Sequence, residues 1–224
     1  MHAVSIPRDT SWLNQLGLGF LQFVYDWDTI VLPSNLTVIV SSPLVLCVEN
    51  LPCSIQLNGV GPSNMQIVGD GQIVCLASAG CSSIYVRSVA FGCRNNYKST
   101  FKIQGSVLIL SGSSFTDCNS DSDGGAIQAY DAALVTIETC NFTNIHSRGF
   151  GGAVAAHGSS LSITKSRLLN CTSKNGGGAV WSSAFQDCYG SDRLKNTQLD
   201  ISLSVFVQCR TGRVSAPNLV LDWD

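Results

Sequence analysis

The chain has 224 residues, of which 45% are hydrophobic and only 12% are charged. A chain of this length and apolar content can bury a core, which argues against disorder. The formal net charge of -2 and the lack of any run of Lys or Arg exclude electrostatic binding to nucleic acid or to an anionic membrane surface. No apolar run approaches the ~20 residues of a membrane-spanning helix, so we expect no membrane insertion.

The first 27 residues are expected to form an N-terminal cap, and 28–224 a single repetitive β domain. Asp9 or Thr10 can cap a short apolar helix through Trp12 and Leu16, which would cover the open end of the β domain. No secretory signal peptide is recognisable at the start of the chain. Strand-like residues 218–221 at the other end predict a truncated or separately capped terminus.

Alternating apolar residues predict strands at 29–32 and 36–40, which would form the first coil. Residues 45–47 and 73–75 are 28 positions apart, and each is followed by a cysteine at the same six-residue spacing, Cys53 and Cys81. We interpret them as two successive coils.

One hydrophobic template then recurs five times. We call one apolar residue of each repeat its landmark, and successive landmarks are 24, 27, 26 and 38 residues apart. Apolar residues stand seven and five positions before each landmark, and a further apolar residue follows the first four landmarks by 12 positions. A repeat of about 25 residues is too short for a strand plus a crossover helix, so stacked coils are predicted. The landmarks are Phe91, Phe115, Phe142, Leu168 and Phe206; their preceding partners are Ile84, Leu108, Val135, Leu161 and Leu199, and Val86, Leu110, Ile137, Ile163 and Ile201; the following ones are Ile103, Ile127, Val154 and Val180.

Three coils carry the sequence Gly-Gly-Ala before an Ile or Val, at 124–126, 151–153 and 177–179. Paired glycines can adopt positive φ, and the small Ala fits inside the resulting corner. Two coils also contain Phe-x-x-Cys. These features resemble the pectate-lyase-like, secreted β-helix proteins with GGA-[ILV] and F-x-x-N repeats, which include the polymorphic outer-membrane proteins. The resemblance covers residues 84–214 and implies an all-β, right-handed parallel β-helix. Cys118, Ile145, Cys171 and Cys209 stand where that family has Asn.

Ten cysteines and three N-glycosylation sequons, at Asn35, Asn141 and Asn170, together indicate an oxidising, extracellular or cell-surface environment. Cysteines at equivalent positions could form disulfides within or between coils, or they could stay reduced in an interior ladder. The disulfide candidates are Cys47, Cys53, Cys75, Cys81, Cys171 and Cys209.

The stretch from landmark to the next apolar strand is fixed at 12 residues, whereas the return path takes 12, 15, 14 and 26. Because loops that vary in length usually build binding surfaces, the long segment 182–198 is the best candidate region. Asp117, Asp121 and Asp123 could bind Ca²⁺ or act as a glycosidase pair, although such runs are more often solvated turns. His157 and Gly158 resemble part of the polygalacturonase Gly-His-Gly motif, but that family's paired aspartates are missing. The weak binding candidates are Asp121, Asp123, His157, Asp187, Asp192, Arg193 and Lys195.

We assign no catalytic residue, cofactor or metal. The sequence favours a non-catalytic extracellular module for adhesion or for glycan or protein binding, with a polysaccharide or a cell-surface protein as partner. The alternative is a lyase or glycoside hydrolase acting on acidic polysaccharide. Two or three carboxylates converging with a basic residue in a groove would favour the enzyme, and a flat face of Ser, Thr and Asn would favour the binding module.

Overall fold

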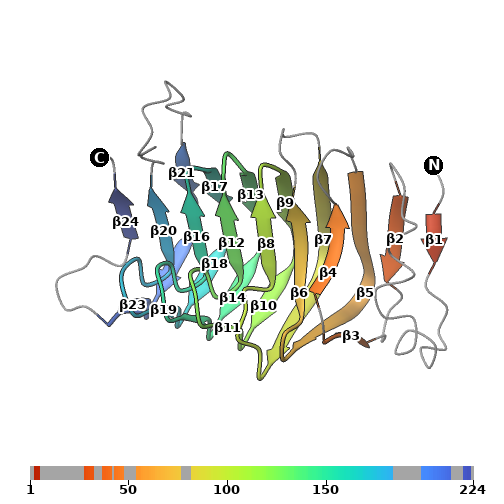
Figure 1. Cartoon of the computed structure of the whole chain (residues 1–224), viewed down its shortest axis with the longest axis horizontal. Helices are drawn as coiled ribbons and strands as arrows, with labels where there is room; N and C mark the ends of the chain where they lie inside the picture. Colours follow the sequence, from red (N-terminus) through yellow and green to blue (C-terminus); the bar gives the residue numbers. More distant parts are fainter. Residues whose placement is uncertain are drawn as a thin grey trace.

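The structure is a computed structural model that describes residues 3–5, 28–32, 37–41, 43–47, 54–76, 82–183, 198–212 and 219–222. All regular elements among these residues are strands, and they stack in parallel as a solenoid whose two chain ends lie at opposite ends (Figure 1). The predicted helix between Asp9 and Leu16 lies outside the described residues. Strand β1 (Ala3–Ser5), inside the predicted cap, pairs in parallel with β2 (Asp28–Leu32).

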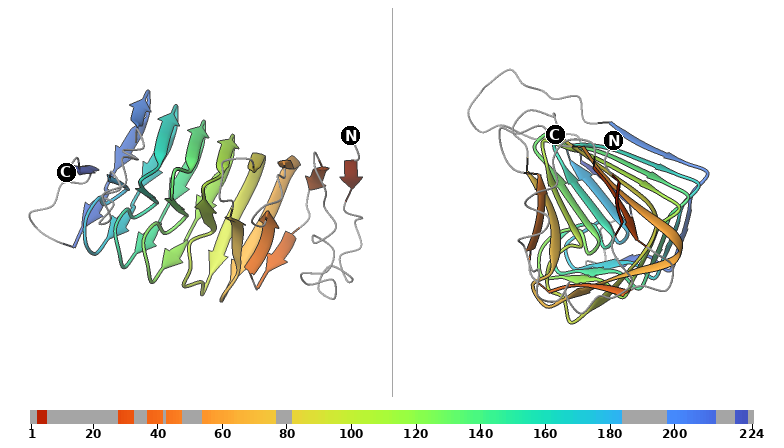
Figure 2. Two further views of the ribbon diagram at one scale, coloured as in Figure 1. Left: turned by 45° about the horizontal axis from the view of Figure 1, so that its top comes forward. Right: turned by 90° about the vertical axis from the view of Figure 1, so that its right-hand side faces the viewer.

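Three parallel sheets form the walls, and the view down the axis shows a roughly triangular cross-section (Figure 2). The long sheet contains β1, β2, β3 (Thr37–Val40), β5 (Ser54–Val68), β7 (Ser83–Arg94), β9 (Val107–Ser111), β10 (Ser114–Thr116), β13 (Leu134–Glu138), β14 (Asn141–Thr143), β17 (Ser160–Thr164), β18 (Arg167–Leu169), β21 (Leu199–Ser202) and β22 (Val205–Val207). The second sheet contains β4 (Pro43–Cys47), β6 (Gln72–Leu76), β8 (Phe101–Gln104), β12 (Ile127–Tyr130), β16 (Val154–His157), β20 (Val180–Ser183) and β24 (Leu219–Asp222). The short sheet contains β11 (Asn119–Ser120), β15 (His146–Ser147), β19 (Thr172–Ser173) and β23 (Arg210–Thr211).

The long sheet supplies two walls. Strands β9, β13, β17 and β21 extend from one half of β7 and form the first wall. Strands β10, β14, β18 and β22 extend from the other half and form the second wall. Successive turns therefore cross from the second sheet to the first wall, then to the second wall and the short sheet. The predicted strands at 29–32, 36–40 and 218–221 are confirmed as β2, β3 and β24 within one or two residues.

The predicted landmark column is confirmed by the register. Phe91, Phe115, Phe142, Leu168 and Phe206 pair in that order across adjacent strands, and the two columns that precede them do the same. The ring centroids of Phe115 and Phe142 are 4.8 Å apart and their planes are nearly parallel. The expectation of full burial is wrong for Phe206, which is 36% exposed because β22 is the terminal described strand of its wall.

The predicted column of apolar residues that follow the landmarks is wrong at its first residue, Ile103. Ile127, Val154 and Val180 are in register, but Phe101 and not Ile103 pairs with Ile127. The stretch from Phe91 to the second sheet is therefore two residues shorter than the same stretch in the next turn. The short sheet begins only in that next turn, at β11. Upstream, Cys47 pairs with Cys75 as predicted, whereas a register shift makes Val45 the partner of Val74.

The two glycines of each Gly-Gly-Ala corner have different roles. The first, at positions 124, 151 and 177, has φ of 62°, as expected for a sharp bend. The second is needed because another turn's backbone approaches closely: a Cβ on Gly152 would lie 2.0 Å from the carbonyl oxygen of Gly178. Ala126, Ala153 and Ala179 are fully buried beside these corners. The prediction that both glycines supply positive φ is thus wrong for the second.

Buried serines satisfy backbone groups at the bend between the two walls of the long sheet. The Oγ of Ser166 accepts a hydrogen bond from the N–H of Cys140 (3.1 Å) and donates one to the carbonyl of Thr164 (2.9 Å). Ser204 repeats both bonds one turn later, with the N–H of Ser166 as donor. A hydroxyl that both accepts and donates suits this buried corner, where an unpaired N–H would be costly.

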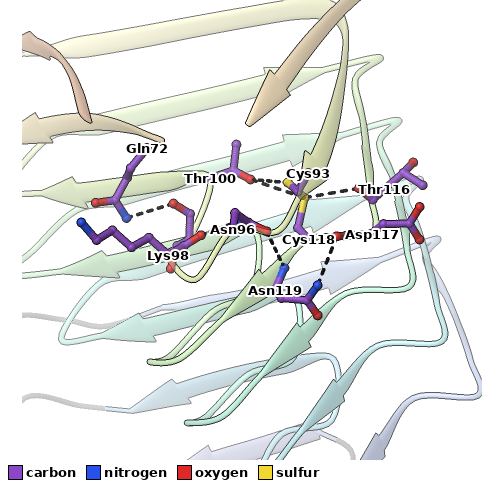
Figure 3. The surroundings of a disulfide bond; sticks show 10 residues. Gln72, Cys93, Asn96, Lys98, Thr100, Thr116, Asp117, Cys118 and Asn119 are labelled. Carbon is purple, nitrogen blue, oxygen red and sulfur yellow. Dashed lines mark hydrogen bonds between the residues drawn. A yellow bond between two sulfur atoms is a disulfide. The ribbon is translucent and has the colours of Figure 1, made fainter. Parts of the chain in front are cut away.

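A disulfide joins two adjacent turns between Cys93 and Cys118 (Figure 3). The hydroxyl of Thr100 lies 3.3 Å from the sulfur of Cys93 and 3.5 Å from that of Cys118. Neither cysteine was a disulfide candidate, because the bond links non-equivalent positions: Phe91 pairs with Phe115, 24 residues on, whereas the two cysteines are 25 apart. A cross-link of this loop length stabilises a fold by about 2–4 kcal/mol.

We predict that Phe142→Ala lowers the free energy of unfolding by about 3–5 kcal/mol, since it removes a fully buried ring stacked on Phe115. Urea unfolding followed by circular dichroism measures this loss. Thr136→Ala, on the exposed face of neighbouring β13, is the control and should change stability by less than about 0.5 kcal/mol. Equal effects would contradict the interior column.

We predict that Gly152→Ala is more damaging than Gly112→Ala, although Gly112 has the positive φ, 58°. A Cβ on Gly112 would find its nearest atom at 3.7 Å, so only the backbone strain of about 1–2 kcal/mol applies. A Cβ on Gly152 would overlap backbone atoms of the next turn. Thermal unfolding of the two variants should rank them in this order, and the reverse order would refute the close-approach role.

Candidate functional site

The return corner is the edge at which the second sheet meets the first wall of the long sheet. It consists of the ends of β8, β12, β16 and β20 and the beginnings of β9, β13, β17 and β21, along the upper edge in Figure 1. The chain bends there through residues with positive φ, namely Gly105, Asp131, Ala132 and Gly158. The long segment predicted as a binding loop leaves this corner after Ser183 and rejoins it at Gln198, and residues 184–197 lie outside the described part.

A row of polar and aromatic side chains follows the corner on the second sheet. Gln104, Tyr130, His157 and Ser183 are register partners on adjacent strands, and all four are partly exposed. The amide of Gln104 donates a hydrogen bond to the carboxylate of Asp131 (2.7 Å). On the same face, the ammonium of Lys102 lies 5.5 Å from the ring centroid of Tyr130, within cation–π range.

His157 and Asp123, two of the predicted binding residues, come together. Nε2 of His157 lies 3.1 Å from Oδ2 of Asp123, and the backbone N–H of Phe150 donates to the other carboxylate oxygen (2.7 Å). Gly149 makes room for this contact, because a Cβ there would lie 1.9 Å from Oδ1 of Asp123. The two partners come from turns that the solenoid brings side by side.

The ring of Trp181 packs against the histidine and is itself packed against the ring of Phe150. The ring of Trp181 lies 4.4 Å from that of His157 and 4.7 Å from that of Phe150, measured between centroids. Trp181 is itself buried, whereas the side chain of His157 is 27% exposed. The cluster therefore holds one imidazole in a fixed orientation, with an edge open to solvent.

The local charges shift two pKa values in this region. Burial tends to raise the pKa of Asp123, but the hydrogen bonds from His157 and from the N–H of Phe150 outweigh it and hold the pKa below 3.8. Partial burial and the adjacent charge of Asp131 raise the pKa of Tyr130. Asp123 is therefore a carboxylate at neutral pH, and Tyr130 keeps its phenol proton.

A shallow hollow of about 300 Å³ lies on the long-sheet side of the corner. Leu134, which is 51% exposed, gives it an apolar patch, and hydroxyl, amide and carboxylate groups surround that patch. Its lining includes Val107, Leu134, Thr136, Ser160, Ser162, Gln198 and Asp200. Three of these follow the return path directly, since Leu134, Ser160 and Gln198 stand at the beginnings of successive strands.

The other predicted carboxylates lie apart from this corner and have their own partners. Asp121 forms an exposed ion pair with Arg148 (3.2 Å), and Asp117 accepts a hydrogen bond from the amide of Asn144 (3.0 Å). Asp117 also borders a second hollow of about 410 Å³ on the other wall. Within the described ranges, no three His, Cys, Asp or Glu side chains gather as a metal site would require. Asp187, Asp192, Arg193 and Lys195 fall outside those ranges.

The remaining cysteine and sequon predictions have mixed outcomes. Cys75, Cys140, Cys171 and Cys209 are buried thiols, and the side chains of Cys47, Cys53 and Cys81 are outside the described part. Asn141 is exposed on β14, and Asn35 is not described. Asn170 is half-buried and its amide donates to Asn144 (2.9 Å).

Sequence reasoning missed Gln104, Tyr130, Leu134, Ser160 and Trp181 as members of the site. A signal was present for one of them, because Tyr130 and His157 both stand three positions after the apolar residue that follows Gly-Gly-Ala. Searching only for charged residues and histidine left out the aromatic and hydroxyl groups at the same repeat positions.

Comparisons with protein-family models, with curated proteins and with solved structures gave no match. No helix among the described residues is long and apolar enough to cross a membrane. The assignment of a function therefore depends on the geometry of the return corner.

We predict that Asp123→Asn lowers the free energy of unfolding by about 1 kcal/mol near pH 7, because it removes the charge that faces His157 but keeps an oxygen for the N–H of Phe150. The depressed pKa means that the carboxylate stabilises the fold above pH 3.8 and that this contribution is lost as the pH falls through the folded-state pKa. Urea unfolding at several pH values should show the two proteins converging at the acidic end. Asp121→Asn, at an exposed ion pair, should show no measurable loss, and a constant gap at all pH values would contradict the pairing.

Proposed function

We propose that this chain is an extracellular, non-catalytic β-helix module that binds a neutral polysaccharide along the return corner. The observation that carries the proposal is the hollow around Leu134, which combines an apolar patch with hydroxyl and amide groups. The row of Gln104, Tyr130 and His157 lies across the corner from it, on the second sheet. Sugar rings present hydroxyl edges and apolar faces, so they require both kinds of contact.

The repetition of the corner suits a polymer. Parallel strands are ~4.8 Å apart, so an extended chain along the solenoid axis would meet an equivalent position on each turn. The charges on this edge are mixed, since Lys102, Asp131 and Asp200 lie near it. With two carboxylates against one ammonium, an acidic polysaccharide would meet more repulsion than attraction, which favours a neutral one.

An extracellular location draws support from two features. A disulfide between Cys93 and Cys118 suits an oxidising compartment. The sequon at Asn141 presents its side chain to solvent on β14, where a glycan could be attached without displacing the core. For the fold, we propose the right-handed, pectate-lyase-like class, with Gly-Gly-Ala repeats related to those of polymorphic outer-membrane proteins.

A hydrolase is less well supported by the same residues. Glycoside hydrolysis generally uses two carboxylates that flank the bond to be cleaved. Asp123 faces His157, and Asp131 accepts a hydrogen bond from the amide of Gln104, so two of the acids near the corner already have partners, and Asp200 is the one carboxylate among the described residues that lines the hollow. The outward faces of β13 and β17 carry Thr and Ser with Leu134 at one end and Glu138 at the other, which suits binding better than acid–base chemistry.

Affinity electrophoresis of the full chain against neutral polysaccharides (cellulose derivatives, xylan, mannan) and against pectin tests this proposal. We expect retardation by at least one neutral polymer and none by pectin. Leu134→Asp should weaken the binding by about tenfold or more, because it places a charge in the hollow. Leu203→Asp is the matched control, since Leu203 is 78% exposed and lies at the other end of β21.

Three outcomes would overturn the proposal. Equal affinity of Leu134→Asp and Leu203→Asp for the polymer would remove the hollow from the binding surface. Release of reducing ends or of unsaturated sugars from any polymer would contradict the non-catalytic assignment. Binding to a cell-surface protein without binding to any glycan would replace the polysaccharide as the partner.

A further inference from the structure

Two interior thiols face each other across the last pair of turns in the described stack. Leu169 and Thr172 pair with Val207 and Arg210, so Cys171 and Cys209, three positions after their landmarks, are in register. The backbone N–H of Arg210 donates to the carbonyl of Cys171 (2.9 Å), so the two successive turns are hydrogen-bonded at this point. Cys171 is fully buried and Cys209 is 6% exposed.

The two thiols interact directly. Their proximity lowers the pKa of Cys209 and raises that of Cys171. The thiol of Cys209 also lies 3.4 Å from the carbonyl oxygen of Leu168 on the neighbouring turn. Cys209, which is also the more exposed of the two, is therefore the better nucleophile.

A disulfide between turns is present at the corresponding corner earlier in the solenoid, although it joins positions one residue out of register. Cys118 is also three positions after its landmark, Phe115, and it is bonded to Cys93 of the preceding turn. The interior of this corner thus accommodates a cross-link between turns. We propose that Cys171 and Cys209 form a second, reversible disulfide that fastens the last described turn to the turn before it.

The oxidant required is a low-molecular-weight disulfide of the glutathione class. The thiolate of Cys209 attacks one sulfur of that disulfide, forming a mixed disulfide and releasing one small thiolate, which takes up a proton. Cys171 then loses its proton, and its sulfur attacks the sulfur of Cys209 and releases the second small thiol. Two protein thiols are oxidised and one small disulfide is reduced to two thiols.

The last described turn is also where such a bond has most effect. Phe206 is 36% exposed, and Val205 is exposed beside it, so this turn is less well packed than those before it. The 38-residue repeat that leads to it contains the long return segment. Local opening should therefore admit the oxidant at Cys209, and the bond once formed should suppress that opening.

The test exposes the full chain to mixtures of glutathione and its disulfide, blocks free thiols with N-ethylmaleimide and digests with trypsin. Peptides 168–174 and 196–210 each contain a single cysteine, so their cross-linked product identifies the bond by mass. We expect this product to appear as the proportion of glutathione disulfide rises and to disappear when reduced glutathione is restored. Cys140, buried without a facing cysteine, is the internal control and should be recovered with maleimide throughout.

A second measurement separates a bond from mere proximity. Amide hydrogen exchange at 205–207 should slow by about tenfold in the oxidised chain, and exchange at 114–116 should not change. Cys171→Ser should give neither the cross-linked peptide nor the slower exchange under the same conditions. Recovery of Cys209 only as a maleimide or glutathione adduct at every redox ratio would overturn the proposal.

Discussion

Hydrogen bonds between turns run along the solenoid axis, so each turn must present its backbone in register with the turn before it. In straight strands this requirement is met by any residue except proline, which lacks the N–H, but at the corners very few residues meet it. The Gly-Gly-Ala corner illustrates the limit: the N–H of Gly125 donates to the carbonyl of Gly152 (2.8 Å), and the N–H of Gly152 donates to that of Gly177 (3.0 Å). A side chain on the second glycine of either corner would occupy the space of the next turn's backbone.

This requirement explains which parts of the fold could be predicted from the sequence. The landmark column was readable because apolar residues that stack in register must recur at the same offsets. The register of Ile103 was not, because a two-residue deletion before β8 and a coincidental apolar residue gave the same spacing. The pairing of Cys93 with Cys118 was missed for a related reason, since it joins positions that are one residue out of register. No pattern in the sequence marks Ser166, whose role as a buried corner group is evident only from its two hydrogen bonds.

The candidate site was predicted only in part. The contact between Asp123 and His157 depends on the path of the corner before each Gly-Gly-Ala strand. Sequence spacing gives the number of residues in that corner but not the distance between the two side chains. The corrected register also changes the predicted contrast between a stretch of fixed length after each landmark and a return path of variable length. From Phe101, Ile127 and Val154 to the next landmark takes 14, 15 and 14 residues, so the return path is nearly constant apart from its single long segment. That segment joins Ser183, beside His157, to Gln198, in the hollow, and thus connects the two sides of the return corner.

In-register stacking of the turns is the central claim, and methyl–methyl nuclear Overhauser effects in a selectively labelled sample test it most directly. Leu110, Ile137 and Ile163 are register partners on β9, β13 and β17 and are fully buried. The account predicts that Ile137 gives its strongest inter-strand cross-peaks to Leu110 and Ile163. Stronger cross-peaks from Ile137 to Leu108 and Leu161, two residues away from these partners, would contradict the register and with it the placement of the corners and of the site.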